Sequence, residues 1–144
     1  LNVGTDKGVT ADMPVITSDG IVGYIAEAGP NWSKVLTIIE SASAVGAYVE
    51  RTGELGLVEG SFDLRGTGLC KLTYLATDSD VKVGDRVLSS GLGSIYPRGL
   101  VVGIVESIEP DQFSRTVTAY VRPTANLEDL TRVMVIKSYE TYAE

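Results

Sequence analysis

The sequence contains no histidine and only one cysteine. Without histidine, Ser-His-Asp and Cys-His catalysis are excluded, because both use an imidazole as base, and nearly all zinc sites are excluded as well. A single cysteine, Cys70, also leaves no intrachain disulfide. We therefore expect a chain that folds around its hydrophobic core alone, with no catalytic residues, no cofactor and no metal site.

Positive charge and long apolar runs are scarce as well. Twelve Lys and Arg stand against 19 Asp and Glu, and the resulting net charge of −7 repels phosphate backbones and anionic lipid headgroups, so no nucleic-acid partner is expected. No apolar run approaches the roughly 20 residues that span a bilayer, and no signal peptide is recognised. Because the chain begins at Leu1 without methionine, we expect an excised piece whose membrane anchor or leader, if any, lies outside it.

Glycine, by contrast, is frequent, with 16 among 144 residues, and divides the chain into short apolar segments. Glycine reaches positive φ cheaply, so these positions predict turns between β-strands, most clearly in the stretch 81–109. The predicted strands are 13–17, 21–26, 35–39, 45–49, 55–58, 69–75, 86–89, 100–108, 116–121 and 133–137. A short helix of one or two turns is predicted within 123–130, and the tail 138–144 should fray. The fold class is therefore all-β.

The alternation of apolar and polar residues in 69–75 gives an expectation for Cys70. A period of two places Cys70 on the same strand face as Leu72 and Tyr74. Cysteine on such a face usually behaves as a small buried hydrophobic residue. We expect Cys70 to be buried and unreactive.

The two halves of the chain share a pattern. The sequence V-I-T-S at 15–18 corresponds to V-L-S-S at 87–90, and 20–25 corresponds to 99–105 with one residue of slippage; from Gly23 and Gly103 onward the offset is constant. This self-similarity predicts two small side-by-side β-barrels, residues 1–66 and 67–144, with a C-terminal strand that could close either barrel. The only large difference is the longer loop 91–98 in the second copy.

Three short motifs suggest chemistry but lack what that chemistry needs. The G-L-G-S-I-Y of 91–96 has neither the third glycine nor the following helix of a dinucleotide loop. Asp78-Ser79-Asp80 lacks the glycine and the bidentate glutamate of a calcium loop. Ser89 or Ser90 with Lys82 would form a dyad only if Lys82 turned inward from its exposed turn. We expect no enzyme.

Three segments carry a resemblance to a known family. They are M-P-V-I-T-x-D-G-I-V-G at 13–23, V-G-D-x-V with S-G-L-G and Y-P-x-G-L-x-V-G between 83 and 103, and P-x-A-N-L-x-x-L with V-M-V-I between 123 and 136. Together they resemble the MreC family of bacterial rod shape-determining proteins over residues 1–137. The chain departs from the family pattern at Asp12, where glycine is common, and at Tyr96, where phenylalanine is common.

The resemblance implies a double β-barrel domain on the extracytoplasmic, periplasmic face of the cytoplasmic membrane. In the full-length protein a single N-terminal membrane helix and a coiled coil would anchor it. It implies a non-enzymatic scaffold of the cell-wall elongation machinery (the elongasome), which binds the elongation-specific class B penicillin-binding protein. It further implies work with MreB, MreD and RodA in sidewall peptidoglycan synthesis. Self-association into dimers or filaments is left open.

The loop 92–98 is the candidate surface for a protein partner, because rigid apolar side chains and arginine are favoured at interface centres. The partner-binding candidates are Leu92, Ile95, Tyr96, Pro97, Arg98 and, in a separate loop, Trp32. As the alternative, Ile95 and Tyr96 would fold back to plug the barrel mouth. Trp32 would likewise cap the open end of the first barrel.

Two other functions fit parts of the sequence. The segment 81–87 resembles a turn in the lipoyl-type and barrel domains of periplasmic efflux-pump adaptor proteins. Such adaptors also need a long helical hairpin, for which the sequence shows no pattern. A trypsin-like double-barrel enzyme is the second alternative, and the absence of histidine argues against it.

Overall fold

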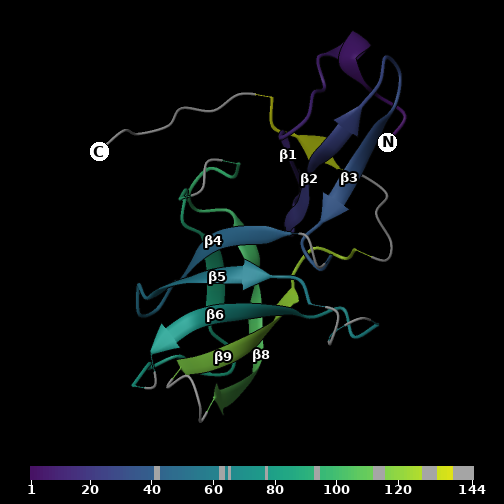
Figure 1. Cartoon of the computed structure of the whole chain (residues 1–144). Helices are drawn as coiled ribbons and strands as arrows, with labels where there is room; N and C mark the ends of the chain where they lie inside the picture. The colour runs from purple at the N-terminus through teal and green to yellow at the C-terminus, as the bar shows by residue number, and fades with distance from the viewer. Residues whose placement is uncertain are drawn as a thin grey trace.

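The computed structural model describes residues 1–40, 43–61, 64, 66–76, 78–92, 95–111, 116–127 and 133–137. Figure 1 shows a barrel with a smaller sheet packed at one end. The elements are η1 (Thr5–Lys7), β1 (Pro14–Thr17), β2 (Gly20–Ala28), β3 (Ser33–Thr37), β4 (Ala44–Val49), β5 (Leu55–Glu59), β6 (Cys70–Ala76), β7 (Arg86–Ser89), β8 (Val101–Asp111), β9 (Thr116–Pro123) and β10 (Met134–Val135). Each predicted strand is present within a few residues of its expected bounds, which confirms the all-β class.

The strands form two sheets. One is a closed barrel in the order β4-β5-β6-β9-β8-β7, and the other is a four-stranded sheet in the order β10-β1-β2-β3. The boundary expected after residue 66 falls between β5 and β6, which pair with each other inside the barrel. Strands β4 and β5 therefore belong with the second half, because they complete its barrel. The C-terminal strand β10 pairs with β1 instead of joining the barrel.

The helix expected within 123–130 is absent from its described part. Residues 121–123 end β9, and 124–127 form turns and irregular backbone. The remainder of that prediction, residues 128–130, and the tail 138–144 lie outside the described residues. Among the described residues, 3-10 helical backbone occurs in η1 and at Leu64.

The internal repeat is visible in the strand registers. In the β1–β2 hairpin Val15 pairs with Gly23, and in the β7–β8 hairpin Val87 pairs with Gly103. Each pair is followed by a β-bulge, and the register then resumes with residues 16 and 21 in the first hairpin and 88 and 101 in the second. A bulge at the same place in both hairpins confirms the correspondence between 15–25 and 87–105.

The repeat extends to the third strand. Ile25 pairs with Val35 of β3, and Val105 pairs with Val121 of β9, again next to a bulge in both copies. The chain entering each copy is also held in the same way. The Asp12 N–H donates to the Ile25 carbonyl at 2.7 Å, and the Gly84 N–H donates to the Val105 carbonyl at 2.8 Å. The same bulged three-stranded unit is thus built twice.

Asp12 occupies a backbone conformation that favours glycine. Its φ is 69°, and its counterpart Gly84 has φ 94°. Left-handed backbone strains a residue with a Cβ, although aspartate tolerates it better than most. We expect Asp12→Gly to raise the free energy of unfolding by about 0.5 kcal/mol, measured by urea denaturation. Thr10→Gly, at negative φ, is the control and should lower stability; a loss of stability in Asp12→Gly as well would contradict the strain argument.

Asp85, in the turn before β7, forms an ion pair with Arg51 in the β4–β5 turn. Its carboxylate accepts hydrogen bonds from Arg51 Nε at 2.8 Å and Nη2 at 3.0 Å, and from the Lys82 N–H at 2.8 Å. The Asp85 side chain is only 8% exposed. The Arg51 guanidinium therefore holds the pKa of Asp85 below its usual range, although burial opposes the shift.

This ion pair gives stability a defined pH dependence. Because the pKa of Asp85 is lower in the folded chain than the unfolded value of about 3.9, its stabilisation is complete above that value and is lost as pH falls through the folded pKa. We expect Asp85→Asn to lower the free energy of unfolding at pH 7 by about 2 kcal/mol and to flatten its decline between pH 7 and pH 3. Urea denaturation measures both. Asp19→Asn, at an exposed turn, is the control, and an unchanged acid decline in Asp85→Asn would refute the assignment.

The hydrophobic core continues from the barrel into the small sheet. Ile21 lies in β2 of the small sheet and Ile38 directly follows β3, and both are fully buried in the hydrophobic cluster of the barrel. A second cluster around Val15 and Ile25 lies within the sheet, and Leu127 packs against both clusters. The sheet and the barrel are therefore joined by shared apolar contacts.

Cys70 is fully buried, as predicted, but the expected face holds only in part. Leu72 is fully buried beside it, whereas Tyr74 is 74% exposed. The reason is a bulge between Leu72 and Leu75, where Tyr74 takes φ 67° and turns outward. Burial raises the pKa of the Cys70 thiol to about 12, so Cys70 is an unreactive core residue.

Candidate partner-binding surface

The loop that distinguishes the second copy leaves β7 and returns to β8 between two glycines at positive φ, Gly91 at 81° and Gly99 at 95°. Ser89 ties the two ends together. Its hydroxyl donates to the Pro97 carbonyl at 2.6 Å and accepts a hydrogen bond from the Leu100 N–H at 2.9 Å. These bonds hold the returning arm of the loop, 95–98, against the end of β7, and they give Ser89 a structural role.

Tyr96 turns into the barrel. Its side chain is 5% exposed and belongs to the barrel core, and Ile95 packs partly buried against the same cluster. Among the described residues the Tyr96 hydroxyl finds no hydrogen-bond partner. Burial, with a smaller effect of Tyr24, raises the pKa of this phenol. The burial of Tyr96 fits the alternative expected for it, in which the ring plugs the barrel mouth, and its contact with a partner stays a prediction.

Two other loop residues face solvent. Leu92 is 64% exposed. The Arg98 guanidinium lies 4.5 Å from the ring centroid of Tyr48, a cation–π distance, and its Nη1 donates to the Ser90 carbonyl at 3.4 Å. Arg98 is thereby oriented while remaining exposed. Leu92 and Arg98, with half-buried Ile95 and Pro97 between them, remain the predicted contact residues.

A hollow of about 440 Å³ lies between this loop and the β4–β5 hairpin. Its lining residues are Ala44, Gly46, Leu55, Gly56, Leu57, Ser90, Leu92, Ile95 and Tyr96. Gly46 makes the close approach of the loop possible, because a Cβ there would crowd the Leu92 carbonyl at 2.7 Å. Sequence reasoning missed this hairpin face. The signal would have been the register of the β4–β5 hairpin. Gly46 pairs with Leu57 and Tyr48 pairs with Leu55, so both leucines lie on the outer face of the barrel.

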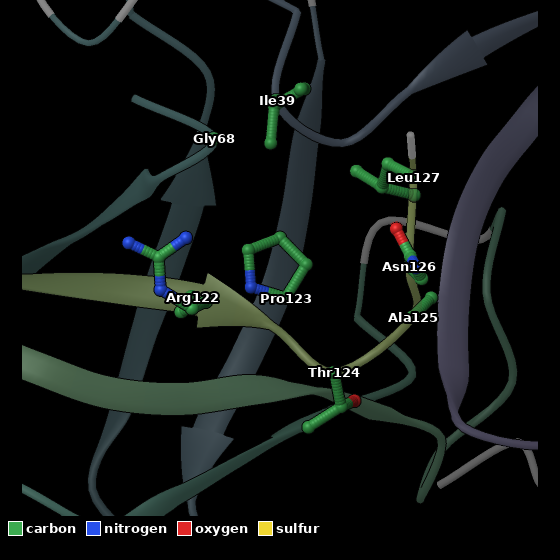
Figure 2. A pocket seen from close by; sticks show the side chains of 8 residues that line it. All are labelled: Ile39, Gly68, Arg122, Pro123, Thr124, Ala125, Asn126 and Leu127. Carbon is green, nitrogen blue, oxygen red and sulfur yellow. The ribbon is translucent and has the colours of Figure 1, made fainter. Parts of the chain in front are cut away.

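A second hollow, of about 310 Å³, lies where the barrel meets the small sheet (Figure 2). It is lined by Ile39, Gly68, Arg122, Pro123, Thr124, Ala125, Asn126 and Leu127. Figure 2 shows Ile39, Pro123 and Leu127 around it, with Arg122 at one side. Arg122 Nε donates to Glu106 Oε1 at 2.8 Å, and this bond lowers the pKa of Glu106. Its walls combine apolar surface with an arginine already engaged by a carboxylate.

Trp32 lies away from the loop. It sits at the β2–β3 turn, which Figure 1 places at the end of the small sheet remote from the barrel. Its side chain is 46% exposed, and its carbonyl accepts a hydrogen bond from the Gly29 N–H at 2.9 Å. The structure thus brings the loop residues together but not Trp32, whose contact with a partner stays a separate prediction.

The part of the chain that the structure describes holds no group of three or more His, Cys, Asp or Glu side chains placed to bind a metal ion. Within the same residues, no helix has the length and apolar character needed to cross a membrane. The exposed loop and the leucine-lined hollow can contact a protein partner through complementary shape and apolar side chains.

Comparison with known proteins identifies the family. Residues 1–137 match the family model described as rod shape-determining protein MreC, barrel core. The chain is 33% identical over 140 residues to the cell shape-determining protein MreC of Listeria monocytogenes, which covers 95% of this chain and 47% of that protein. It therefore spans about half the length of that relative.

Solved structures agree with the sequence match. The crystal structure of MreC from Pseudomonas aeruginosa superposes with a TM-score of 0.87 at 27% identity, over 94% of this chain and 85% of that one. The same fold occurs, with a TM-score of 0.69 and 19% identity over 85% of this chain and 74% of the other, in a complex between penicillin-binding protein PBP2 and MreC from Helicobacter pylori. On these matches the chain belongs to the MreC family of rod shape-determining proteins.

Proposed function

We propose that this domain is a non-enzymatic scaffold of the cell-wall elongation machinery and that it binds a class B penicillin-binding protein. Family membership supports a role in cell shape, and the shared fold with the MreC of the PBP2 complex supports the kind of partner. The protein would work on the periplasmic side of the cytoplasmic membrane, tethered there by a single membrane helix in the full-length chain. A relative with this fold is the major periplasmic domain of the cell shape-determining filament MreC.

The observation that carries the proposal is the exposed loop between β7 and β8, which internal contacts hold in place. It is the insertion that distinguishes the β7–β8 hairpin from the β1–β2 hairpin of the first copy, and its returning arm is anchored from inside by Tyr96 and Ser89. Leu92, 64% exposed, borders the leucine-lined hollow, and Leu55 on the opposite wall is 53% exposed. Apolar side chains held on a rigid support lose little entropy on binding, which suits a docking surface.

The wider machinery belongs to the same proposal. MreB, MreD and RodA would assemble around the full-length protein, as the family resemblance implies. Self-association into dimers or filaments is a further expectation. No feature of the described residues favours the efflux-adaptor or trypsin-like alternatives over the scaffold.

The loop can be tested by substitution. We expect the double variant Leu92→Ser with Arg98→Ala to bind the periplasmic region of the cognate class B penicillin-binding protein at least tenfold more weakly, because loss of anchor side chains typically costs about 1–2 kcal/mol each. Calorimetric titration measures the affinity. Val83→Ser, 66% exposed in the turn at the other end of β7, is the matched control. Unchanged affinity in a folded double variant would remove the loop from the interface.

A further inference from the structure

Tyr74 has a backbone conformation that this chain elsewhere gives to glycine. Its φ is 67°, and of the described residues with positive φ all but Asp12 and Tyr74 are glycines. Left-handed backbone is rare for a bulky residue, because its Cβ crowds the following carbonyl oxygen. Glycine at position 74 would form the same bend without this strain. The tyrosine therefore lowers the stability of the fold at this position.

The bulge needs the backbone conformation of Tyr74 but not its ring. By placing two successive residues, Thr73 and Tyr74, on the outer face, the bulge returns Leu75 to the buried face beside Leu72. The Tyr74 side chain itself is 74% exposed and lies outside both hydrophobic clusters. Backbone strain that the core does not use is typical of functional positions. The ring is therefore a feature of the outer surface.

Tyr74 lies beside the β4–β5 hairpin, on the side opposite the loop between β7 and β8. Its neighbour Thr73 pairs with Leu57 of β5, and Leu55, two residues from Leu57, shares the same outer face. Both leucines line the hollow that Leu92 borders from the loop. Since β4 pairs with β7 and β5 pairs with β6, the hairpin separates the loop from the bulge.

The exposed apolar side chains thus follow one another across the barrel wall. Figure 1 shows β4, β5 and β6 side by side on this wall. Leu92 is 64% exposed on the loop, Leu55 is 53% exposed on β5, and Tyr74 is 74% exposed on β6. The partner-binding surface described above is therefore continuous with the ring of Tyr74.

We propose that Tyr74 is an anchor of the partner-binding surface, which extends from the loop over the β4–β5 hairpin to the β6 bulge. This rests on the proposed function, and the occupant is the same class B penicillin-binding protein, which would contact Tyr74, Leu55 and Leu92 with one apolar face. Tyrosine is among the residue types that carry most of the binding energy at interfaces. The fixed backbone of the bulge holds the ring in place before binding, so little conformational entropy is lost.

Paired measurements of affinity and stability test this role. We expect Tyr74→Gly and Tyr74→Ala to bind the periplasmic region of the penicillin-binding protein about tenfold more weakly or less, measured by calorimetric titration. In urea denaturation the midpoint of Tyr74→Gly should lie above that of Tyr74→Ala and no lower than that of the wild type, because only glycine relieves the strain. A residue with a merely structural role would lose affinity and stability together.

Two control variants isolate the ring. Tyr74→Phe keeps the aromatic contact area and should bind within about twofold of the wild type. Met134→Ala removes another exposed apolar side chain, 54% exposed on β10 of the small sheet, and should bind as the wild type does.

Three results would overturn the proposal. A Tyr74→Gly variant with wild-type affinity would remove Tyr74 from the interface and leave the proposed function standing, because the wild-type chain and the Leu92→Ser, Arg98→Ala variant test that function separately. A loss of affinity with a lowered urea midpoint would make Tyr74 a structural residue. Self-association of the chain alone that disappears in Tyr74→Gly, measured by sedimentation, would assign the ring to a contact between copies.

Discussion

Replacing Tyr96 with alanine should lower the free energy of unfolding by about 3–5 kcal/mol, because a 5% exposed aromatic side chain would leave a cavity in the barrel mouth. Replacing it with phenylalanine should instead raise the free energy of unfolding. The Tyr96 hydroxyl is buried without a hydrogen-bond partner among the described residues, so its removal should stabilise the fold by about 1 kcal/mol. The pair of variants separates the volume of the ring from the cost of its hydroxyl.

Urea denaturation at pH 7 measures both effects. Leu92→Ala, 64% exposed in the same loop, is the control for the alanine variant, and Tyr74→Phe, 74% exposed, is the control for the phenylalanine variant. Both controls should change stability by no more than about 0.5 kcal/mol. A Tyr96→Ala variant as stable as these controls would show that the ring does not plug the barrel and would return it to the candidate interface.

Alanine at Gly103 should destabilise the protein by about 3 kcal/mol or more, at the upper end of overpacking costs. A Cβ at Gly103 would collide with the backbone carbonyl of Arg122 on the neighbouring strand, where nothing flexible can give way. The same prediction applies to the first copy of the repeat, because a Cβ at Gly23 would collide with the Leu36 carbonyl in the same way. Gly23→Ala should therefore cost a comparable amount.

Gly53→Ala is the matched control for these two variants. Gly53 has φ 75° but no atom within 4 Å of an added Cβ, so it should cost only about 1 kcal/mol of left-handed backbone strain. Thermal or urea unfolding of the three variants gives the comparison. If Gly103→Ala proved no worse than Gly53→Ala, the close approach of β8 and β9 at this bulge would be refuted.

Local patterns were sufficient to predict the strands. The turn at residues 18–19 and the alternation in 45–49 involve neighbours in sequence, and both are found as predicted. The repeat was also predictable, because Gly23 and Gly103 are kept for a steric reason that acts alike in both copies. Cys70 was predictable for the same reason as any small apolar residue on an alternating strand.

Pairing between distant strands was less accessible. The sequence of β4 and β5 is typical of half-buried strands, but nothing local indicates that they close the barrel of the second half. The outward turn of Tyr74 depends on a bulge opposite β9, which the period of two does not reveal. At the candidate site the loop was found from its place in the repeat. The inward direction of the Tyr96 side chain could not be predicted, because an aromatic residue in a loop is equally compatible with filling the barrel mouth and with contacting a partner protein.

The central claim is that this domain acts by holding another protein. Isothermal titration calorimetry of the wild-type domain with the periplasmic region of the cognate class B penicillin-binding protein tests it most directly. The claim predicts a saturable one-to-one complex with a negative heat-capacity change, as burial of apolar surface requires. An absence of binding heat at domain concentrations of about 100 μM, which would saturate any complex with a Kd of about 1 μM or below, would contradict it.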